Sequence, residues 1–171
     1  MDGEAGEERA GKKAFVIDTN VIISAMLKET GYTRRILTLL TELHPTYTPE
    51  YAIKEIRKYA DYLAEKKNLP REKQQALIKL ITENINIIEE RRYETYTPEA
   101  KTLTKDPGDI DFVALSLKLR ETYREVVLLT WNTRDYKTGE LGKRGITVLS
   151  PKDVLGAFLI SMKRSPTYKH P

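Results

Sequence analysis

Five short runs of β-forming residues alternate with longer stretches of helical periodicity, and this alternation constrains the fold more than any other feature of the sequence. Strands that are separated by helices pair in parallel and carry helices on both faces of their sheet. The sequence therefore predicts an α/β fold with a central, mostly parallel sheet. The five runs are AFVID (14–18), a short run within HPTYTP (44–49), INIIE (85–89), VVLLTWN (126–132) and ITVLS (146–150).

The helical stretches predict which residues reach the core. One helix is expected over 32–43, a second from about Pro49 to Asn68 and a third after Pro70, because proline is favoured in the first turn of a helix. The segments 91–105 and 133–145 are polar and are predicted to be irregular, apart from one helical turn after Pro98. The apolar residues expected to point inward from these three helices are Ile36, Leu39, Leu40, Leu43, Ile53, Ile56, Ala60, Leu63, Leu77, Leu80 and Ile81.

Length and composition favour one domain. The chain has 171 residues, of which 40% are hydrophobic and 32% charged, and no linker or internal repeat interrupts it. We expect a charged leader over 1–13, a single domain over 14–163 and a tail over 164–171. The leader lacks the apolar core of a signal peptide and no stretch approaches 18 apolar residues, so a cytoplasmic protein without a membrane partner is predicted.

The scarcity of soft ligands narrows the chemistry. The sequence has no cysteine and only two histidines, His44 and His170. Disulfides, thiolate sites and a cysteine nucleophile are therefore excluded, and a histidine-rich zinc site is not expected. A metal bound here would be a hard cation with oxygen ligands. The net charge of +4 permits a polyanionic partner without requiring one.

Acidic residues stand at positions that a parallel sheet would bring together. Asp18 ends the first apolar run, Asn132 ends the fourth, and Asp135 follows three residues later. The carboxyl ends of parallel strands meet at one edge, where functional residues gather. Asp109 precedes an apolar helix, and Glu55 lies at the border of the buried face of its own helix. We therefore predict that these four carboxylates converge on one point.

Crowded carboxylates repel one another and stay ionised when a cation lies between them. Mg²⁺ or Mn²⁺ suits an all-oxygen site, and such a centre activates water for hydrolysis of a phosphodiester. Each residue also has a simpler interpretation: Asp18 or Asp109 as a helix cap, Glu55 as a solvated helix charge, and Asp111, Asp106 or Asp135 as loop or surface charges. Asp111 reaches the same metal as Asp109 only if Asp109 precedes the first helical turn.

Five segments, in order and spacing, resemble a PIN domain over about residues 14–160. This family includes the VapC-type toxins of toxin–antitoxin pairs and nucleases of RNA processing and decay. The resemblance implies a three-layer α/β/α sandwich and an endoribonuclease that depends on Mg²⁺ or Mn²⁺. The DTN after the first strand and the D-x-x-x-A-L-S-L pattern from Asp109 are its most specific parts. The segments are FVIDTNVIISAML, YAIKEIRKY, DPGDIDFVALSLKL, VVLLTWNTRDY and ITVLSPKDVL.

By position, Asp18, Glu55 and Asp109 match the three principal acidic residues of the family, with Asp111 as a further metal ligand. Thr19 or Asn20 would steady Asp18 or a metal-bound water. Asn132 stands where an aspartate is common, and Asp135 is shifted by about one residue. This departure leaves open whether one or two metals bind. The residues concerned are catalytic Asp18, Glu55, Asp109 and Asp135, metal-binding Asp18, Glu55, Asp109 and Asp111, and supporting Thr19, Asn20 and Asn132.

The expected partners follow from the same resemblance. RNA, single-stranded or structured, would be the substrate, and an antitoxin protein or a second copy of the chain are further partners. Most of the basic residues are simply solvated helix charges. Trp131 and the tyrosines offer rings that stack on bases, although Tyr59 and Tyr62 at helical spacing are more often packing residues. The basic residues expected near the cleft are Arg57, Lys58, Arg134, Lys143 and Arg144.

Three rival interpretations of the acidic residues are possible. A phosphatase of the haloacid dehalogenase type needs a second aspartate where this chain has Asn20, and a receiver domain needs a paired acid before Asp18 and a lysine after a late strand. Neither fits the sequence. The third rival is a catalytically weak PIN-like module that binds RNA or a protein. Asn132 favours that module, whereas the intact Asp18, Glu55 and Asp109 favour the nuclease.

Overall fold

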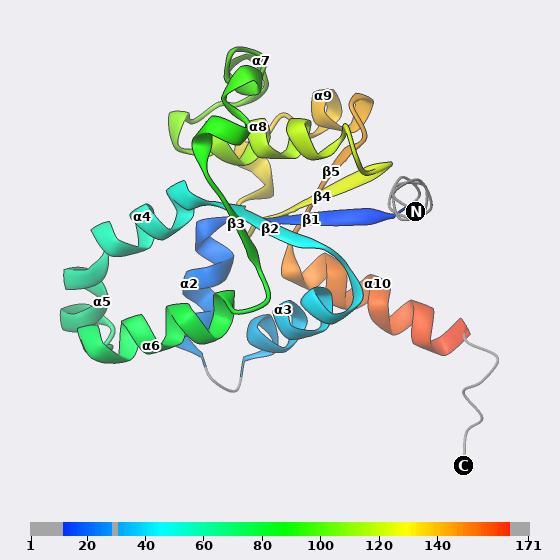
Figure 1. The fold of residues 1–171 in the computed structure, drawn as a ribbon. Helices are drawn as coiled ribbons and strands as arrows, with labels where there is room; N and C mark the ends of the chain where they lie inside the picture. Colours follow the sequence, from blue (N-terminus) through cyan, green and yellow to red (C-terminus); the bar gives the residue numbers. More distant parts are fainter. Residues whose placement is uncertain (1–11, 29–30, 165–171) are drawn as a thin grey trace, which may run out of the picture.

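The computed structural model describes residues 12–28 and 31–164, and a five-stranded sheet forms its centre. The strands lie in the order β3–β2–β1–β4–β5, and each is parallel to its neighbours (Figure 1). The predicted parallel sheet is thereby confirmed. The strands are β1 (Lys13–Ile17), β2 (Thr46–Pro49), β3 (Asn86–Ile88), β4 (Glu125–Leu129) and β5 (Ile146–Leu149).

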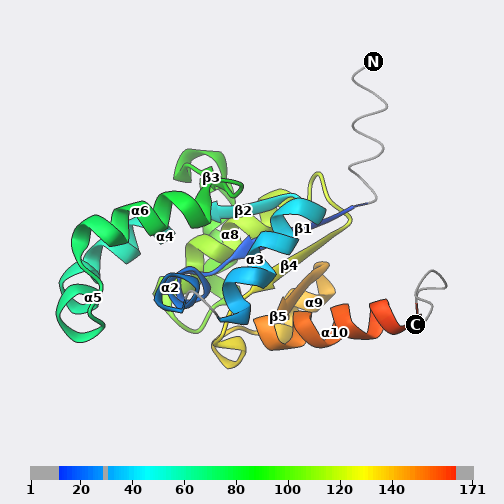
Figure 2. The same cartoon turned by 90° about the horizontal axis from the view of Figure 1, so that it is seen from below.

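Helices cover both faces of this sheet, as the α/β/α sandwich requires (Figures 1 and 2). α7, α8 and α9 lie on one face and α2, α3 and α10 lie on the other, while α4, α5 and α6 project beyond the sheet and α6 packs against α2 and α3. The helices are α2 (Thr19–Leu27), α3 (Tyr32–Leu43), α4 (Glu50–Lys58), α5 (Ala60–Lys66), α6 (Arg71–Thr82), α7 (Thr97–Leu103), α8 (Ile110–Leu119), α9 (Thr138–Lys143) and α10 (Pro151–Arg164), with 3₁₀ turns η1 (Glu90–Arg92), η2 (Glu94–Tyr96), η3 (Pro107–Asp109) and η4 (Thr133–Asp135).

The two central strands are buried on both faces, which explains why their sequences are continuous apolar runs rather than alternating ones. Val16 and Ile17 of β1 and Leu128 and Leu129 of β4 are fully buried. Each such side chain contributes about 1.5–3 kcal/mol through removal of its apolar surface from water. These strands form a rigid frame, and the segments that leave their ends are held by it.

The register of the central strands brings the ends of two distant segments together. Ile17 pairs with Leu129 at the last position of each strand. The backbone N–H of Asp18 then donates to the carbonyl of Leu129 at 2.9 Å, and that of Thr130 donates to Leu149 at 2.9 Å. Asp18 and Thr130 therefore leave the sheet side by side at its carboxyl edge, where the sequence placed the functional residues.

The predicted second helix is in fact two helices. Tyr59 has φ −90° and ψ 7°, which turns the chain between α4 and α5 and lets both Ile56 and Leu63 remain in the core. Asn68 then adopts a left-handed φ of 53°, a conformation that asparagine tolerates better than most residues, and the chain reverses after α5. The expected inward stripe is confirmed for Ile53, Ile56 and Leu63, and Ala60 is half-buried.

Three leucines expected in the core are exposed. Leu80 of α6 is 58% exposed, and Leu39 and Leu43 of α3 lie at the border of a surface pocket. Periodicity predicts which side of a helix is apolar, but the neighbouring elements cover only part of that side. In α3 the expected Ile36 and Leu40 are buried, and Thr33 and Leu37 are buried beside them.

The two segments predicted as irregular contain helices α7 and α9. Tyr93, Ala100 and Leu103 are buried beside α8, and Tyr136 and Leu141 are buried in the segment beside β5. The expected helical turn after Pro98 lies within α7. The rest of these segments is too polar for a helix to be predicted from the local pattern, and their few apolar residues are sufficient because they reach an existing core. Packing thus decides these elements rather than local propensity.

The expected leader and tail fall largely outside the described part of the chain, since residues 1–11 and 165–171 are not described. Lys13 begins β1 and Arg164 ends α10. Of the helices in the described ranges, none is long and apolar enough to cross a membrane.

Candidate active site at the carboxyl edge of the sheet

Asp18 is held between two hydroxyl groups at the carboxyl edge. Its side chain is only 6% exposed, and Oδ2 accepts hydrogen bonds from Thr130 Oγ1 at 2.8 Å and from Tyr136 Oη at 2.9 Å. Burial raises the pKa of Asp18, and these two hydrogen bonds oppose the rise. Asp18 occupies the N-cap position of α2, but its Oδ2 is directed to residues that lie more than 100 positions away in the sequence.

The two residues after Asp18 extend this anchoring in different directions. Thr19 Oγ1 donates to Glu55 Oε1 at 2.7 Å, which connects α2 with α4. Asn20 accepts from the backbone N–H of Trp131 at 3.0 Å, and its Nδ2 donates to Thr130 Oγ1 at 3.2 Å. Asn20 therefore supports Asp18 through Thr130, whereas Thr19 supports Glu55.

Asp109 reaches the same place from the other face of the sheet. It ends η3 and precedes the first turn of α8, and the side chain of Asp106 accepts from the Gly108 N–H to cap this turn. Tyr136 Oη donates to Asp109 Oδ1 at 3.2 Å, while Oδ2 is buried without a hydrogen-bond partner. Burial, followed by the charges of Asp18 and Asp106, raises the pKa of Asp109 to about 7.

The other acidic residues lie close enough to Asp18 and Asp109 for their charges to act on one another. Burial raises the pKa of Glu55, and the charges of Asp18 and Asp111 add to the rise. Asp111 Oδ2 accepts a hydrogen bond from the buried Tyr93 at 2.6 Å. Tyr51 of α4 lies among these acids: burial raises its pKa, and Glu55, Asp111, Asp106 and Asp109 all contribute to the rise.

Asn132 and Asp135 lie at the exposed rim of the site. The backbone N–H of Asn132 donates to Thr130 Oγ1 at 3.1 Å, and its carbonyl accepts from the N–H of Asp135. The charge of Asp135 contributes to the raised pKa of Asp109. The backbone of Asn132 thus helps to hold the Thr130 side chain in place, and this contact does not involve the Asn132 side chain.

The predicted RNA-binding residues fall into two groups. Arg57 and Lys58 are exposed in the last turn of α4, two and three residues after Glu55. Arg144 instead forms ion pairs with Glu99 and Glu140, and Lys143 pairs with Glu140. Arg134 is exposed in η4, and its carbonyl accepts from Lys105. Trp131 is half-buried and its ring contacts Tyr32 edge-on, whereas Tyr59 and Tyr62 are exposed rather than packed.

Tyr136 and Thr130 are the site residues that the sequence analysis missed as functional groups. Thr130 was detectable, because it is the first polar residue after a buried strand. Tyr136 carried no such signal, since it lies in a polar segment and its contact with Asp18 joins positions 118 residues apart.

The donors at this edge fit a divalent cation in kind. They are carboxylate oxygens, the charges that raise the pKa of Asp109 are all acidic, and one of its oxygens is buried and unpaired. Within residues 12–28 and 31–164, no three His, Asp or Glu side chains are gathered closely enough to hold a metal ion by themselves. Mg²⁺ commonly binds through one or two carboxylates and keeps several waters, so the pair Asp18 and Asp109 is sufficient. The full acidic set stays a prediction.

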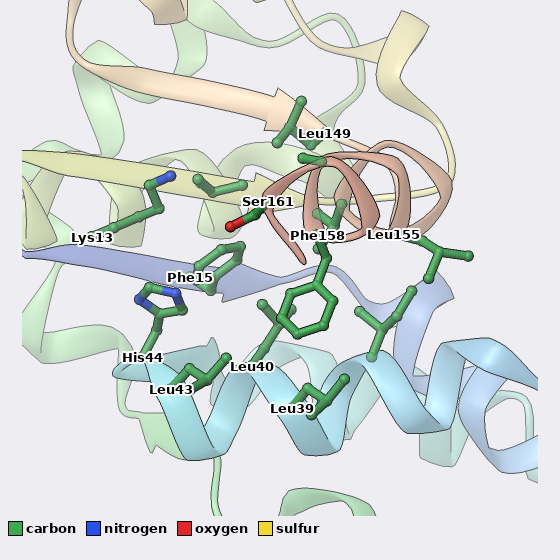
Figure 3. Close-up of a pocket in the computed structure, with 14 residues that line it drawn as sticks. Lys13, Phe15, Leu39, Leu40, Leu43, His44, Leu149, Leu155, Phe158 and Ser161 are labelled. Carbon is green, nitrogen blue, oxygen red and sulfur yellow. The ribbon is translucent and has the colours of Figure 1, made fainter. Parts of the chain in front are cut away.

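An apolar surface pocket lies apart from the acidic residues. This pocket of about 270 Å³ opens between α3, α10 and the sheet, and Figure 3 shows Phe158 of α10 pointing toward Leu39 and Leu40 of α3. Lys13 and His44 stand at its polar end. Burial lowers the pKa of His44, and the positive charge of Lys13 lowers it further.

Comparison with known proteins supplies the family and the fold. The family model described as "PIN domain" matches residues 16–122. VapBC2 from Rickettsia felis was solved bound to a DNA fragment from its promoter. One of its chains superposes with a TM-score of 0.59 at 14% identity, and the match covers 80% of this chain and 98% of that one. A chain of DNA-bound VapBC from Salmonella typhimurium superposes with a TM-score of 0.57 at 19% identity, and the match covers 82% of this chain and 99% of that one. A chain of VapBC-1 from nontypeable Haemophilus influenzae superposes with a TM-score of 0.53 at 17% identity, and the match covers 81% of this chain and 98% of that one. No curated protein matches the sequence.

Proposed function

The chain belongs to the PIN domain family, and from this premise we propose that it is an endoribonuclease that depends on Mg²⁺ or Mn²⁺. One observation carries the proposal. Asp18 and Asp109, from opposite faces of the sheet, meet at a single hydroxyl group at its carboxyl edge, and a buried oxygen of Asp109 has no partner. Two carboxylates so placed need a positive charge to stay ionised at neutral pH.

Asp18 and Asp109 would hold the cation, with Glu55 and Asp111 near them. A bound divalent cation lowers the pKa of a coordinated water and neutralises charge on phosphate oxygens. Thr130 and Tyr136 keep Asp18 in one orientation, and Thr19 does the same for Glu55. Glu55, whose pKa is raised, is the carboxylate best suited to accept a proton from an attacking water.

Arg57 and Lys58 are the basic residues that we propose contact the RNA backbone next to the scissile bond. Both follow Glu55 on α4 and are exposed. Lys143 and Arg144 are already engaged by acidic residues, so their contribution to phosphate binding is expected to be smaller. Single-stranded RNA is the preferred substrate in this proposal, because exposed Tyr59 beside these cations offers a ring to an unpaired base.

A protein partner is the second part of the proposal. The solved chains of similar fold come from VapBC assemblies, and an antitoxin-like polypeptide would correspond to their second component. A second copy of the chain is the other candidate. The exposed leucines beside the apolar pocket, Leu39 and Leu43, support such an interface. Size-exclusion chromatography with light scattering separates a monomer from a dimer directly.

The rival function remains a PIN-like module that binds RNA or protein with little catalysis. Asn132, in place of the aspartate that is common in the family, supports it. So does the lack, within the described residues, of three acids gathered closely enough to hold a metal.

The deciding experiment is cleavage of a mixed single-stranded RNA with Mg²⁺ and with Mn²⁺. Wild type, Asp18→Asn and Asp61→Asn are compared, and Asp61 is the matched control because it is an exposed aspartate on α5. Metal-dependent cutting by wild type and Asp61→Asn, lost in Asp18→Asn, supports the nuclease. Wild-type protein that binds RNA but is inert with both metals refutes it and favours the binding module.

A further inference from the structure

Tyr136 connects the two central carboxylates of the proposed site. Its hydroxyl lies 2.9 Å from Asp18 Oδ2 and 3.2 Å from Asp109 Oδ1. A tyrosine hydroxyl has one proton, so it can donate a full hydrogen bond to only one of the two at a time. Only 2% of the residue is exposed, so the hydroxyl depends mainly on these two carboxylates for its hydrogen bonds.

The backbone around Tyr136 is fixed by contacts with the end of α7. Tyr136 forms an isolated antiparallel bridge with Thr104, and its carbonyl accepts from the Thr138 N–H at 3.0 Å. On either side, Lys105 Nζ donates to the carbonyl of Arg134 and Lys137 Nζ donates to that of Thr102, at 2.9 and 3.0 Å. The ring therefore enters the site from a segment that is anchored on both sides.

We propose that Tyr136 is a positioning residue that sets the separation of the Asp18 and Asp109 carboxylates and thereby strengthens binding of a divalent cation. This inference rests on the proposed metal-dependent function. Two carboxylates without a shared donor repel each other and move apart. A donor between them keeps an oxygen of each within reach of the same point, so less ordering remains to be done when a cation binds. Tyr136 itself is not a ligand in this arrangement.

The test compares Mn²⁺ binding by wild type, Tyr136→Phe and Tyr123→Phe of the full chain, by isothermal titration calorimetry. Tyr123 is the matched control, because it is equally buried and its hydroxyl is hydrogen-bonded to that of Tyr47, away from the acidic residues. A pH of about 8 is used for all three proteins, above the pKa of about 7 of Asp109. We expect the Mn²⁺ affinity of Tyr136→Phe to fall about 10-fold, the usual scale for loss of a group that orients a ligand, while Tyr123→Phe stays near wild type.

A second readout separates positioning from a general loss of structure. RNA cleavage by Tyr136→Phe should return to nearly the wild-type rate at saturating Mn²⁺, because the ligands themselves are intact. The Mn²⁺-induced increase in melting temperature provides a measurement that does not depend on activity. Unfolding of Tyr136→Phe without metal, while Tyr123→Phe stays folded, would show a structural role for the Tyr136 hydroxyl and would overturn the inference.

The outcomes are distinguishable. Wild-type protein that fails to bind Mn²⁺ overturns the metal-dependent function and this inference together. Wild-type binding with unchanged affinity in Tyr136→Phe overturns the inference alone. Tighter binding by Tyr136→Phe also overturns it, since the hydroxyl would then compete with the cation rather than prepare the site. Cleavage by Tyr136→Phe that stays low at saturating Mn²⁺ contradicts a positioning role as well.

Discussion

The acidic edge and the apolar pocket depart from the usual distribution of residues in opposite ways. At the acidic edge, Asp18 is 6% exposed among core side chains, although burial of a carboxylate is unfavourable. Beside the apolar pocket, Leu43 is 58% exposed, although water disfavours it. The first departure is offset inside the chain by hydroxyl groups of Thr130 and Tyr136. The second has no such compensation among the described residues, and the contrast supports the proposed chemistry at the first region and the proposed protein partner at the second.

The largest effect is expected from Asp18→Asn. Cleavage should fall by at least about 100-fold, the scale of losing one positioned catalytic group. The free energy of unfolding of the metal-free protein should stay the same or rise, because burial raises the pKa of Asp18 and asparagine removes that buried charge. Urea unfolding with EDTA measures the stability. A large loss of stability together with activity would mean that Asp18 is a structural residue.

Two leucines one turn apart on α3 test the apolar region. Leu40 is buried whereas Leu43 is exposed, although both line the pocket. Leu40→Ala should lower the free energy of unfolding by about 2–5 kcal/mol, the range for buried leucines. Leu43→Ala should change it by less than about 0.5 kcal/mol. Thermal and urea unfolding of the two variants measure both changes in stability. Equal losses would mean that the pocket is closed in solution, for example by a second copy of the chain.

The pH dependence of stability should come from the acidic edge. Asp109 has a folded pKa of about 7 against an ordinary value of 3.8, so the folded state binds its proton more tightly than the unfolded state does. Its contribution is fully present below about pH 4 and is lost as the pH rises to about 7. Asp18 and Glu55, whose pKa values are also raised, act with the same sign.

Urea unfolding of metal-free protein between about pH 4 and 8 measures this effect, with Asp109→Asn as the comparison. The variant should show a smaller decrease in stability with rising pH. A decrease of the same size in both proteins would exclude Asp109 as its source.

The smallest effect on function is expected from substitution of the exposed basic residues. Arg57→Ala should weaken RNA binding and reduce the slope of log affinity against log salt by about 1, as expected for one lost phosphate contact. Lys143→Ala should reduce it less, because Lys143 is paired with Glu140. Filter binding at several salt concentrations gives both slopes. Equal slopes for the two variants would place the RNA elsewhere on the surface.

The sequence by itself determined the parallel sheet, the place of its strands along the chain and the family, although β4 ends at Leu129 and not at the expected Asn132. The continuous apolar runs of β1 and β4 could only be buried on both faces, and a parallel pairing places Asp18 and the segment after Leu129 at one edge. The position of Asp109 before a strongly apolar helix was also readable, because the polar turn and the helix are local features.

Only the tertiary structure decided which side chains meet. Tyr136 between Asp18 and Asp109, and Thr19 on Glu55, are contacts between distant segments that no local pattern records. The same holds for Leu43, which belongs to an apolar stripe that its neighbours cover incompletely. Periodicity states which face of an element avoids water. Which elements pack against that face, and how much of it they cover, depends on segments from elsewhere in the chain.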